Sequence, residues 1–426
     1  MLFRSGRGRA GRALAAAVML APACGAPDGP PAPPAPGHAT DAEPEHASTG
    51  AETGAPESGA PDDAAASSDD GRATTQPSEA GADAGAATDA SSVSADTGAT
   101  LPSGDSGSRP VCTFASGLNV AWVNFANDVP NPDMTAFRTI FTNTRNAGGR
   151  VIRWWFHTNG TVTPGYDANG MVQKIPASHI AAVTAVLNAA HAAGVAIDLS
   201  LWSFDMLQAN AGNAHVNNQA LLTVDANRQS YIDNYLTPLV VALKGNPGLY
   251  AYEIFNEPEG MTPTGWATYR VAETFIQKTV NWFADAIHAA DPSALVTNGA
   301  QEFQYCSNVS GKTNYYSDSA LATVGGRPKG TLDFYEVHYY SVNGTSNSCF
   351  LHPASYWGLD KKLVMGEFFA QTTDGVAQAD TYTYLYTNGY NGAWAWSYDA
   401  DNRWPSMQVP LQNLYAAQAA TVGACP

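Results

Sequence analysis

Eight short apolar runs, separated by longer stretches of helical periodicity, constrain the fold of this chain more than any other feature. The runs cover residues 117–122, 151–156, 196–202, 249–255, 295–298, 332–339, 363–367 and 392–396. Between them, apolar side chains recur with helical spacing in 133–148, 180–194, 231–240 and 266–289. Regular alternation of buried strands and amphipathic helices is typical of a parallel sheet built from β-α units.

Eight such strands favour a closed barrel over an open sheet. A doubly wound α/β sheet is the alternative, but no glycine-rich nucleotide loop follows the first run. Residues 111–426 are long enough for one barrel with extended loops. We therefore predict an α/β fold, a (β/α)8 TIM barrel, for this region.

The segment 25–110 has a different composition. It consists mainly of Ala, Gly, Pro, Ser, Thr and Asp, with hardly any aromatic or large aliphatic side chains. Such a segment buries too little apolar surface to offset its conformational entropy, so we predict a disordered linker. Its 15 acidic residues against Arg72 and Arg109 give −13 of the chain's net charge of −17. No basic stripe remains to indicate a nucleic-acid partner.

The first 24 residues are typical of an export signal. Arg4, Arg7, Arg9 and Arg12 precede a short apolar run at 13–20, and small residues follow at 21–23. The segment resembles a bacterial lipobox, which predicts cleavage before Cys24 and a lipid on that cysteine. Simple secretion after residue 23 is the alternative. We expect a monomer that is either secreted or anchored as a lipoprotein to the bacterial cell surface or outer membrane.

The cysteine count agrees with export. Five cysteines leave four in the folded region once Cys24 is set aside. A closed barrel brings its two ends together, which predicts a Cys112–Cys425 disulfide. The remaining pair follows the fifth and sixth strands on neighbouring loops, which predicts a Cys306–Cys349 disulfide.

Two glutamates end predicted strands. Glu257 follows the fourth run in Asn256-Glu257-Pro258, and Glu367 ends the seventh run after Gly366. Functional residues of a TIM barrel gather where the strands end, so carboxylates far apart in sequence can meet at its mouth. Such a pair is suited to acid-base and nucleophilic chemistry.

These motifs resemble glycoside hydrolase family 5, which includes cellulases and β-mannanases. The resemblance is carried by Tyr252-Glu-Ile-Phe-Asn-Glu-Pro258, Val337-His-Tyr-Tyr340 and Met365-Gly-Glu-Phe368, with Gly117-Leu-Asn119 and Trp394-Ala-Trp396 in the family's order. It implies a retaining glycosidase that cleaves polysaccharide by double displacement and needs no cofactor. The nine histidines also show no metal-binding spacing.

The resemblance also implies roles for individual residues. Glu257 would be the general acid/base and Glu367 the nucleophile. Asn256 would bind the sugar 2-hydroxyl, and Arg153 would keep Glu367 ionised. The remaining predicted sugar contacts and site-lining residues are Trp202, His338, Tyr340 and Trp396, of which Tyr340 would bond Glu367 and Trp396 would form a platform under a sugar. Glu253 is expected deeper in the barrel, paired with Arg153.

The sequence predicts the polysaccharide substrate less precisely than it predicts the reaction. Trp202 stands where cellulase-type members usually have histidine, and with Glu253 this favours β-1,4-mannan. Glu259 stands where fungal-type mannanases usually have arginine, so β-1,4-glucan or another β-glucan remains the alternative. A surface glycan-binding protein on an inactive barrel is a further alternative. Such a binding protein would not require both glutamates, so the presence of the pair favours an enzyme.

Overall fold

The computed structural model describes residues 112–399 and 403–425. The predicted export signal, Cys24 and the linker 25–110 lie outside the described residues. Within the described part, no helix has the length and apolar character needed to cross a membrane.

Eight parallel strands form a closed barrel in chain order, as predicted, with β8 pairing back to β1. The strands are β1 (Ala115–Ala121), β2 (Val151–Trp155), β3 (Ala196–Ser203), β4 (Leu249–Asn256), β5 (Val296–Ala300), β6 (Phe334–His338), β7 (Lys362–Glu367) and β8 (Gly392–Ala395). Every neighbouring pair is parallel, because each strand is followed by a connection that returns to the same end of the barrel.

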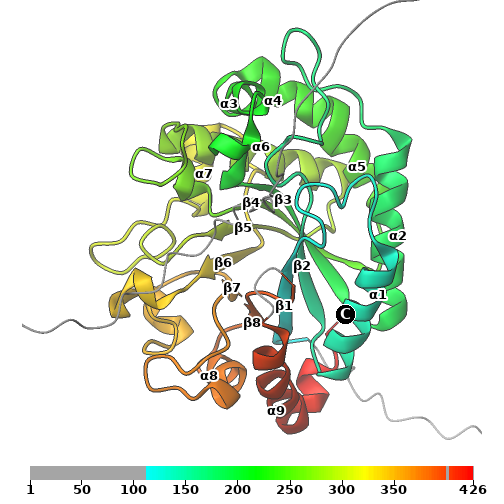
Figure 1. Ribbon diagram of the computed structural model, residues 1–426. Coiled ribbons are helices and arrows are strands. Elements are labelled where there is room, and N and C mark those ends of the chain that lie inside the picture. The colour runs from blue at the N-terminus through cyan, green and yellow to red at the C-terminus, as the bar shows by residue number, and fades with distance from the viewer. Residues whose placement is uncertain (1–111, 400–402, 426) are drawn as a thin grey trace, which may run out of the picture. The chain divides into compact units, whose positions relative to one another are not determined.

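Helices surround the barrel, so its strands are covered on their outer side (Figure 1). They are α1 (Met134–Asn146), α2 (Ala177–Ala193), α3 (Ala214–Thr223), α4 (Asp225–Tyr231), α5 (Thr237–Leu243), α6 (Glu273–Ala290), α7 (Asp318–Gly325), α8 (Thr381–Thr387) and α9 (Trp404–Val422). A π-helical turn, Ile232–Leu236, joins α4 to α5, so the helix predicted through 231–240 is continuous but not uniform.

Helix α1 illustrates how local sequence sets these elements. The Asp133 carboxylate caps the helix by accepting hydrogen bonds from the backbone N–H groups of Thr135 and Ala136. Phe137 and Phe141 lie one turn apart and are fully buried against the barrel. The predicted face and start of this helix are therefore confirmed.

Helix α6 begins later than predicted, at Glu273 instead of residue 266. Residues 266–272 do not form helical hydrogen bonds, because their backbone pairs with other loops. Ala267 N–H donates to the Gly260 carbonyl, Tyr269 N–H to Leu207, and Val271 N–H to Met261. This segment braces the loops that follow β3 and β4.

The interior of the barrel has two distinct layers near its middle. Ala115, Val151, Ala251, Phe334, Val364 and Trp394 form an apolar cluster of their own. Two residues further along their strands, Arg153, Glu253 and Glu336 are fully buried and charged or titratable. Because alternate residues of a strand face the same side, this polar layer lies directly above the apolar one.

The disulfide predicted between the ends of the domain is confirmed. Cys112 and Cys425 are bonded, with a Cα–Cα distance of 4.5 Å across 313 residues of sequence. The predicted Cys306–Cys349 disulfide is wrong, because both are free, buried thiols. A position on the loops after β5 and β6 therefore does not bring the two sulfur atoms together.

Candidate active site

The two glutamates singled out by the sequence meet at the carboxyl ends of the strands. Glu257 directly follows β4 and Glu367 ends β7. One carboxylate oxygen of each and one ring nitrogen of His338 all lie within 4.8 Å of one another. Carboxyl groups of retaining glycosidases lie about 5 Å apart, whereas inverting enzymes need about 6.5–9.5 Å to admit a water. The observed approach corresponds to the retaining geometry.

Arg153 of β2 is the centre of the buried network below this pair. Its side chain is fully buried and donates to both oxygens of Glu253, at 2.6 and 2.7 Å. This confirms that Glu253 lies deeper and pairs with Arg153. The guanidinium also donates to the side-chain oxygens of Asn119 at 2.9 Å, Asn256 at 2.8 Å and Glu367 at 2.5 Å. The branched guanidinium thus links β2 to β1, β4 and β7 and fixes the positions of these side chains.

Glu367 receives two hydrogen bonds, one on each carboxylate oxygen. Arg153 Nη1 donates to Oε1, and the Tyr340 hydroxyl donates to Oε2 at 2.6 Å. Burial raises the pKa of Glu367 to about 7, and the Arg153 charge and both hydrogen bonds oppose this rise. The predicted contacts are confirmed, but the net shift is upward because burial outweighs the arginine.

Glu257 is held differently. Its Oε1 lies 2.9 Å from His338 Nδ1, within hydrogen-bonding distance. Burial and the negative charge of Glu367 raise the pKa of Glu257 well above its usual range. The backbone is left-handed, with φ 45° and ψ 54°. Such a conformation is costly for a residue with a side chain and is concentrated at functional sites.

Asn256 is oriented by partners on both sides of its amide. Its Oδ1 accepts from Arg153, and its Nδ2 donates to the Ser203 hydroxyl at 3.2 Å. The Ser203 hydroxyl in turn donates to Asp205 at 2.7 Å. An amide nitrogen carries two hydrogens, so one remains for a hydroxyl group at the mouth of the barrel.

An aromatic wall flanks the mouth. Trp396 follows β8, is half-buried, and contacts Trp122 and Trp155 at ring-centroid distances of 6.0 and 5.7 Å. The sequence indicated Trp396 but not the other two, although both lie at the ends of β1 and β2. Aromatic faces of this kind pack well against apolar surfaces of a ligand.

The prediction that Trp202 contacts a ligand is wrong. Its side chain is fully buried, and its ring packs on His157 at 4.5 Å and on Tyr231 of α4 at 5.7 Å. The end of β3 turns this ring towards the helices, and the loop after β2 covers it at Gly160. A tryptophan at a strand end can therefore be core as readily as binding surface.

Glu259 is also buried rather than exposed to the cleft. It accepts hydrogen bonds from the Tyr316 hydroxyl and from the Gln301 backbone N–H. Burial raises the pKa of Glu259 to about 7. These contacts tie the loop after β4 to the loop after β5, so Glu259 supports the loops that carry the site.

Two groups of side chains present atoms close enough together to share a metal ion. They are Glu253, Glu336 and His338, and Glu257, His338 and Glu367. Arg153 already lies 2.6 Å from Glu253, 3.1 Å from Glu336 and 2.5 Å from Glu367. A divalent cation beside this guanidinium would meet a like charge, so the arginine serves as the cation of both groups.

The family model of Cellulase (glycosyl hydrolase family 5) matches residues 113–402. The chain belongs to glycosyl hydrolase family 5. It is therefore a glycoside hydrolase, and the resemblance carried by the strand-end motifs is confirmed.

Individual relatives agree with this assignment. The chain is 33% identical to a protein described as mannan endo-1,4-beta-mannosidase from Mytilus edulis, over 71% of this chain and 88% of that protein. A protein of the same description from Cryptopygus antarcticus is 33% identical over 67% of this chain and 81% of its own length. The solved β-mannanase structure from Mytilus edulis covers 71% of this chain and 92% of its own, with a TM-score of 0.66 and 32% identity.

Proposed function

We propose that this family 5 member is a retaining, endo-acting hydrolase of β-1,4-linked mannan. The similarity to the Mytilus edulis and Cryptopygus antarcticus mannosidases supports this substrate, because each is matched over more than four fifths of its own length.

The observation that carries the mechanism is the unequal support of the two carboxyl groups. Glu367 accepts from Arg153 and Tyr340, which favours its ionised form as nucleophile. Glu257 bonds instead to the His338 ring, whose pKa is lowered by burial, and keeps its proton. Glu257 gives this proton to the glycosidic oxygen as the bond to the anomeric carbon breaks, and a Glu367 oxygen attacks that carbon.

The second step reverses these roles. Water attacks the anomeric carbon of the glycosyl ester, the Glu257 carboxylate accepts the water's proton, and Glu367 leaves as a carboxylate. Asn256 offers its remaining amide hydrogen to the sugar 2-hydroxyl. Trp396 packs against the sugar one subsite from the cleaved bond.

The location of the enzyme is part of the same proposal. The N-terminal signal and the linker indicate export, and the Cys112–Cys425 disulfide supports an oxidising compartment. Cys24 is the proposed lipid attachment site. A Cys24→Ser variant is expected to leave the membrane fraction of the producing cell, and an unchanged distribution would contradict the anchor.

Product analysis tests the substrate. The full chain is incubated separately with linear mannan, glucomannan, carboxymethylcellulose and mixed-linkage β-glucan, and products are profiled over time. We expect rapid release of mannooligosaccharides of mixed length from mannan. Faster cleavage of the glucans than of mannan would overturn the mannan proposal, and binding without cleavage of any substrate would contradict the assigned chemistry.

A further inference from the structure

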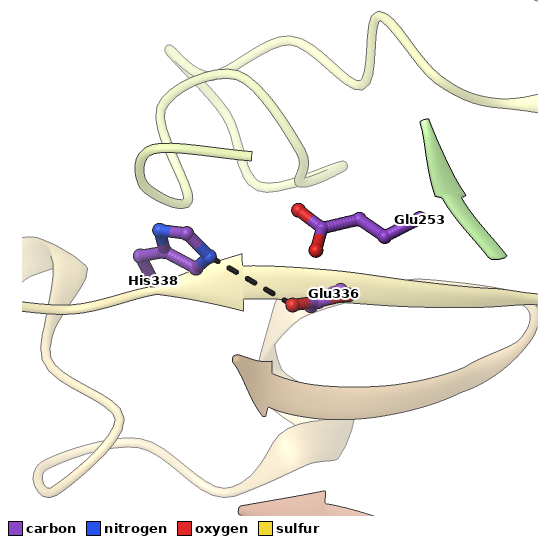
Figure 2. A group of neighbouring side chains, drawn as sticks. All are labelled: Glu253, Glu336 and His338. Atoms are coloured by element: carbon purple, nitrogen blue, oxygen red, sulfur yellow. Dashed lines mark ion pairs between the residues drawn. The ribbon is translucent and has the colours of Figure 1, made fainter. Parts of the chain in front are cut away.

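An acidic residue of β6, Glu336, lies beneath the catalytic pair and has no assigned role. It is fully buried two residues before His338 on the same strand. Figure 2 shows the His338 ring turned towards the Glu336 carboxyl group, with Glu253 facing both from β4. Glu336 Oε1 lies 3.1 Å from Arg153 Nε and 3.8 Å from His338 Nε2.

The space for this carboxyl group is provided by a glycine. A Cβ atom at Gly366 would lie 2.3 Å from Glu336 Oε1, and one at Gly299 would lie 3.1 Å from His338 Nε2. A side chain at Gly366 would therefore displace Glu336, and one at Gly299 would displace Glu253, 2.3 Å away, and crowd His338. Gly366 directly precedes Glu367, so the position of Glu336 is coupled to the end of β7.

Arg153 has no hydrogen left for Glu336. An arginine side chain carries five N–H donors. In this structure Nε donates to Glu253, Nη1 to Asn119 and Glu367, and Nη2 to Glu253 and Asn256. These bonds use all five, and neither Glu336 oxygen has a hydrogen-bond partner among the described residues.

A buried carboxylate that receives no hydrogen bond is strongly unfavourable, which favours the neutral acid of Glu336 even though Arg153 Nε lies 3.1 Å away. Burial and the negative charge of Glu253 raise the pKa of Glu336 well above its usual range, and the Arg153 charge opposes this rise. A neutral acid carries an O–H donor and needs an acceptor. His338 Nε2 is buried and has no partner among the described residues, and burial lowers the pKa of His338, which leaves the ring neutral.

We propose that Glu336 is a positioning residue whose O–H turns towards His338 Nε2 and so fixes the proton of the His338 ring on Nδ1. The separation of 3.8 Å is longer than a hydrogen bond, so a small carboxyl rotation accompanies the contact. The inference deepens the proposed function, on which it rests, by assigning control of the acid proton at the same site.

The tautomer matters because His338 Nδ1 lies 2.9 Å from Glu257 Oε1. With the proton on Nδ1, the ring donates to Oε1, and the acid proton of Glu257 resides on Oε2, available to the leaving oxygen. With the proton on Nε2, Nδ1 is an acceptor and takes the Glu257 O–H for itself. Glu336 thereby directs the acid proton towards the substrate without touching it.

Histidine spectroscopy on the full chain tests the tautomer independently of any substrate. Nitrogen-15 signals of labelled histidine distinguish a protonated from an unprotonated ring nitrogen, and loss of a signal in a His338→Asn variant identifies it. We expect the proton on Nδ1 in the wild type and in Glu336→Gln, whose amide can also donate. A Glu336→Met variant is expected to gain the Nε2–H form. A wild-type ring protonated on Nε2, or a Glu336→Met ring unchanged, overturns the proposal.

Leaving-group dependence supplies the kinetic test. Glu336→Met is expected to lose at least about tenfold in kcat on aryl β-mannooligosides with a poor leaving group, but little on an activated dinitrophenyl substrate that needs no proton. Glu336→Gln is expected to resemble wild type, and Tyr339→Phe serves as a control on the neighbouring residue of His338, because the Tyr339 hydroxyl donates to Asp374 and not to this network. Equal losses on both substrates in both Glu336 variants would indicate packing alone and overturn the proposal. If mannosides are not substrates at all, the spectroscopic result still decides it.

Discussion

At the scale of single residues, two glutamates take different catalytic roles because their surroundings differ. Glu257 and Glu367 are both largely buried, so burial raises both pKa values. Of these two glutamates, Glu367 accepts the hydrogen bonds from Arg153 and Tyr340, and it therefore releases its proton before Glu257 does. Two carboxyl groups whose environments differ in this way take the roles of nucleophile and acid.

Removing Glu367 tests its role directly. Glu367→Ala is expected to lose nearly all turnover, because it removes the carboxylate that lies within 4.8 Å of the Glu257 carboxyl oxygen and acts as nucleophile. Azide should then restore cleavage of an activated aryl mannoside and give the glycosyl azide of inverted configuration. Glu257→Ala is the matched control, since azide attack on the intact glycosyl ester gives the retained product. Substantial unaided turnover by Glu367→Ala would contradict the assignment.

Tyr340 should set the acidic limb of the pH profile. Its hydrogen bond to Glu367 lowers the pKa of that carboxyl group, so Tyr340→Phe should raise it further. Since the nucleophile must be ionised, the acidic limb of kcat/KM is expected to move to higher pH. Tyr339→Phe is the control, because the Tyr339 hydroxyl donates to Asp374 and not to the pair. A limb that stays in place, or moves to lower pH, would refute this role for Tyr340.

At the scale of elements, sequence periodicity predicted all eight strands, with ends shifted by at most a few residues. The prediction succeeded because the strands are short, largely buried runs, and some end in a recognisable motif, as β4 does at Asn256. It was wrong where tertiary contacts decide the outcome. The stretch 266–272 has helical spacing, but its backbone bonds to neighbouring loops.

The prediction of the site succeeded and failed for the same reasons. Motifs at strand ends identified Glu257, Glu367, Arg153 and Tyr340, because each position is fixed by the barrel. Sequence alone did not reveal Glu336, since a single acid inside an apolar run gives no signal of its partners. It also could not separate Trp202, a core residue, from the half-buried Trp396, because side-chain direction at a strand end depends on the loops above it.

Helix α1 allows a prediction about a single element. Asp133 accepts two backbone N–H groups at the start of the helix, at 2.9 and 3.0 Å. Asp133→Ala leaves both without this acceptor and should lower the free energy of unfolding by about 1 kcal/mol. Urea denaturation measures the loss, and Asp133→Asn should recover most of it because its side-chain oxygen also accepts. Equal stability of all three proteins would show that water replaces the cap.

At the scale of the whole molecule, barrel closure explains why the first and last described residues meet. Pairing of β1 with β8 returns the chain to its starting point, and α9 packs back towards β1. Cys112 and Cys425 bond there, below the amino end of β1. The catalytic pair lies at the opposite, carboxyl ends of the strands. Stability and catalysis are therefore supported at opposite ends of the barrel.

This separation predicts that the disulfide contributes to stability but not to turnover. Replacing both Cys112 and Cys425 by alanine should lower the free energy of unfolding by about 2–4 kcal/mol, because the bond restricts a loop of most of the folded chain in the unfolded state. Turnover per folded molecule should stay at the wild-type level below the unfolding transition. A reductant should destabilise the wild type to the same extent and leave the double variant unaffected, since Cys306 and Cys349 are free thiols. Further destabilisation of the double variant by reductant would indicate a second disulfide between those two cysteines and contradict the structure.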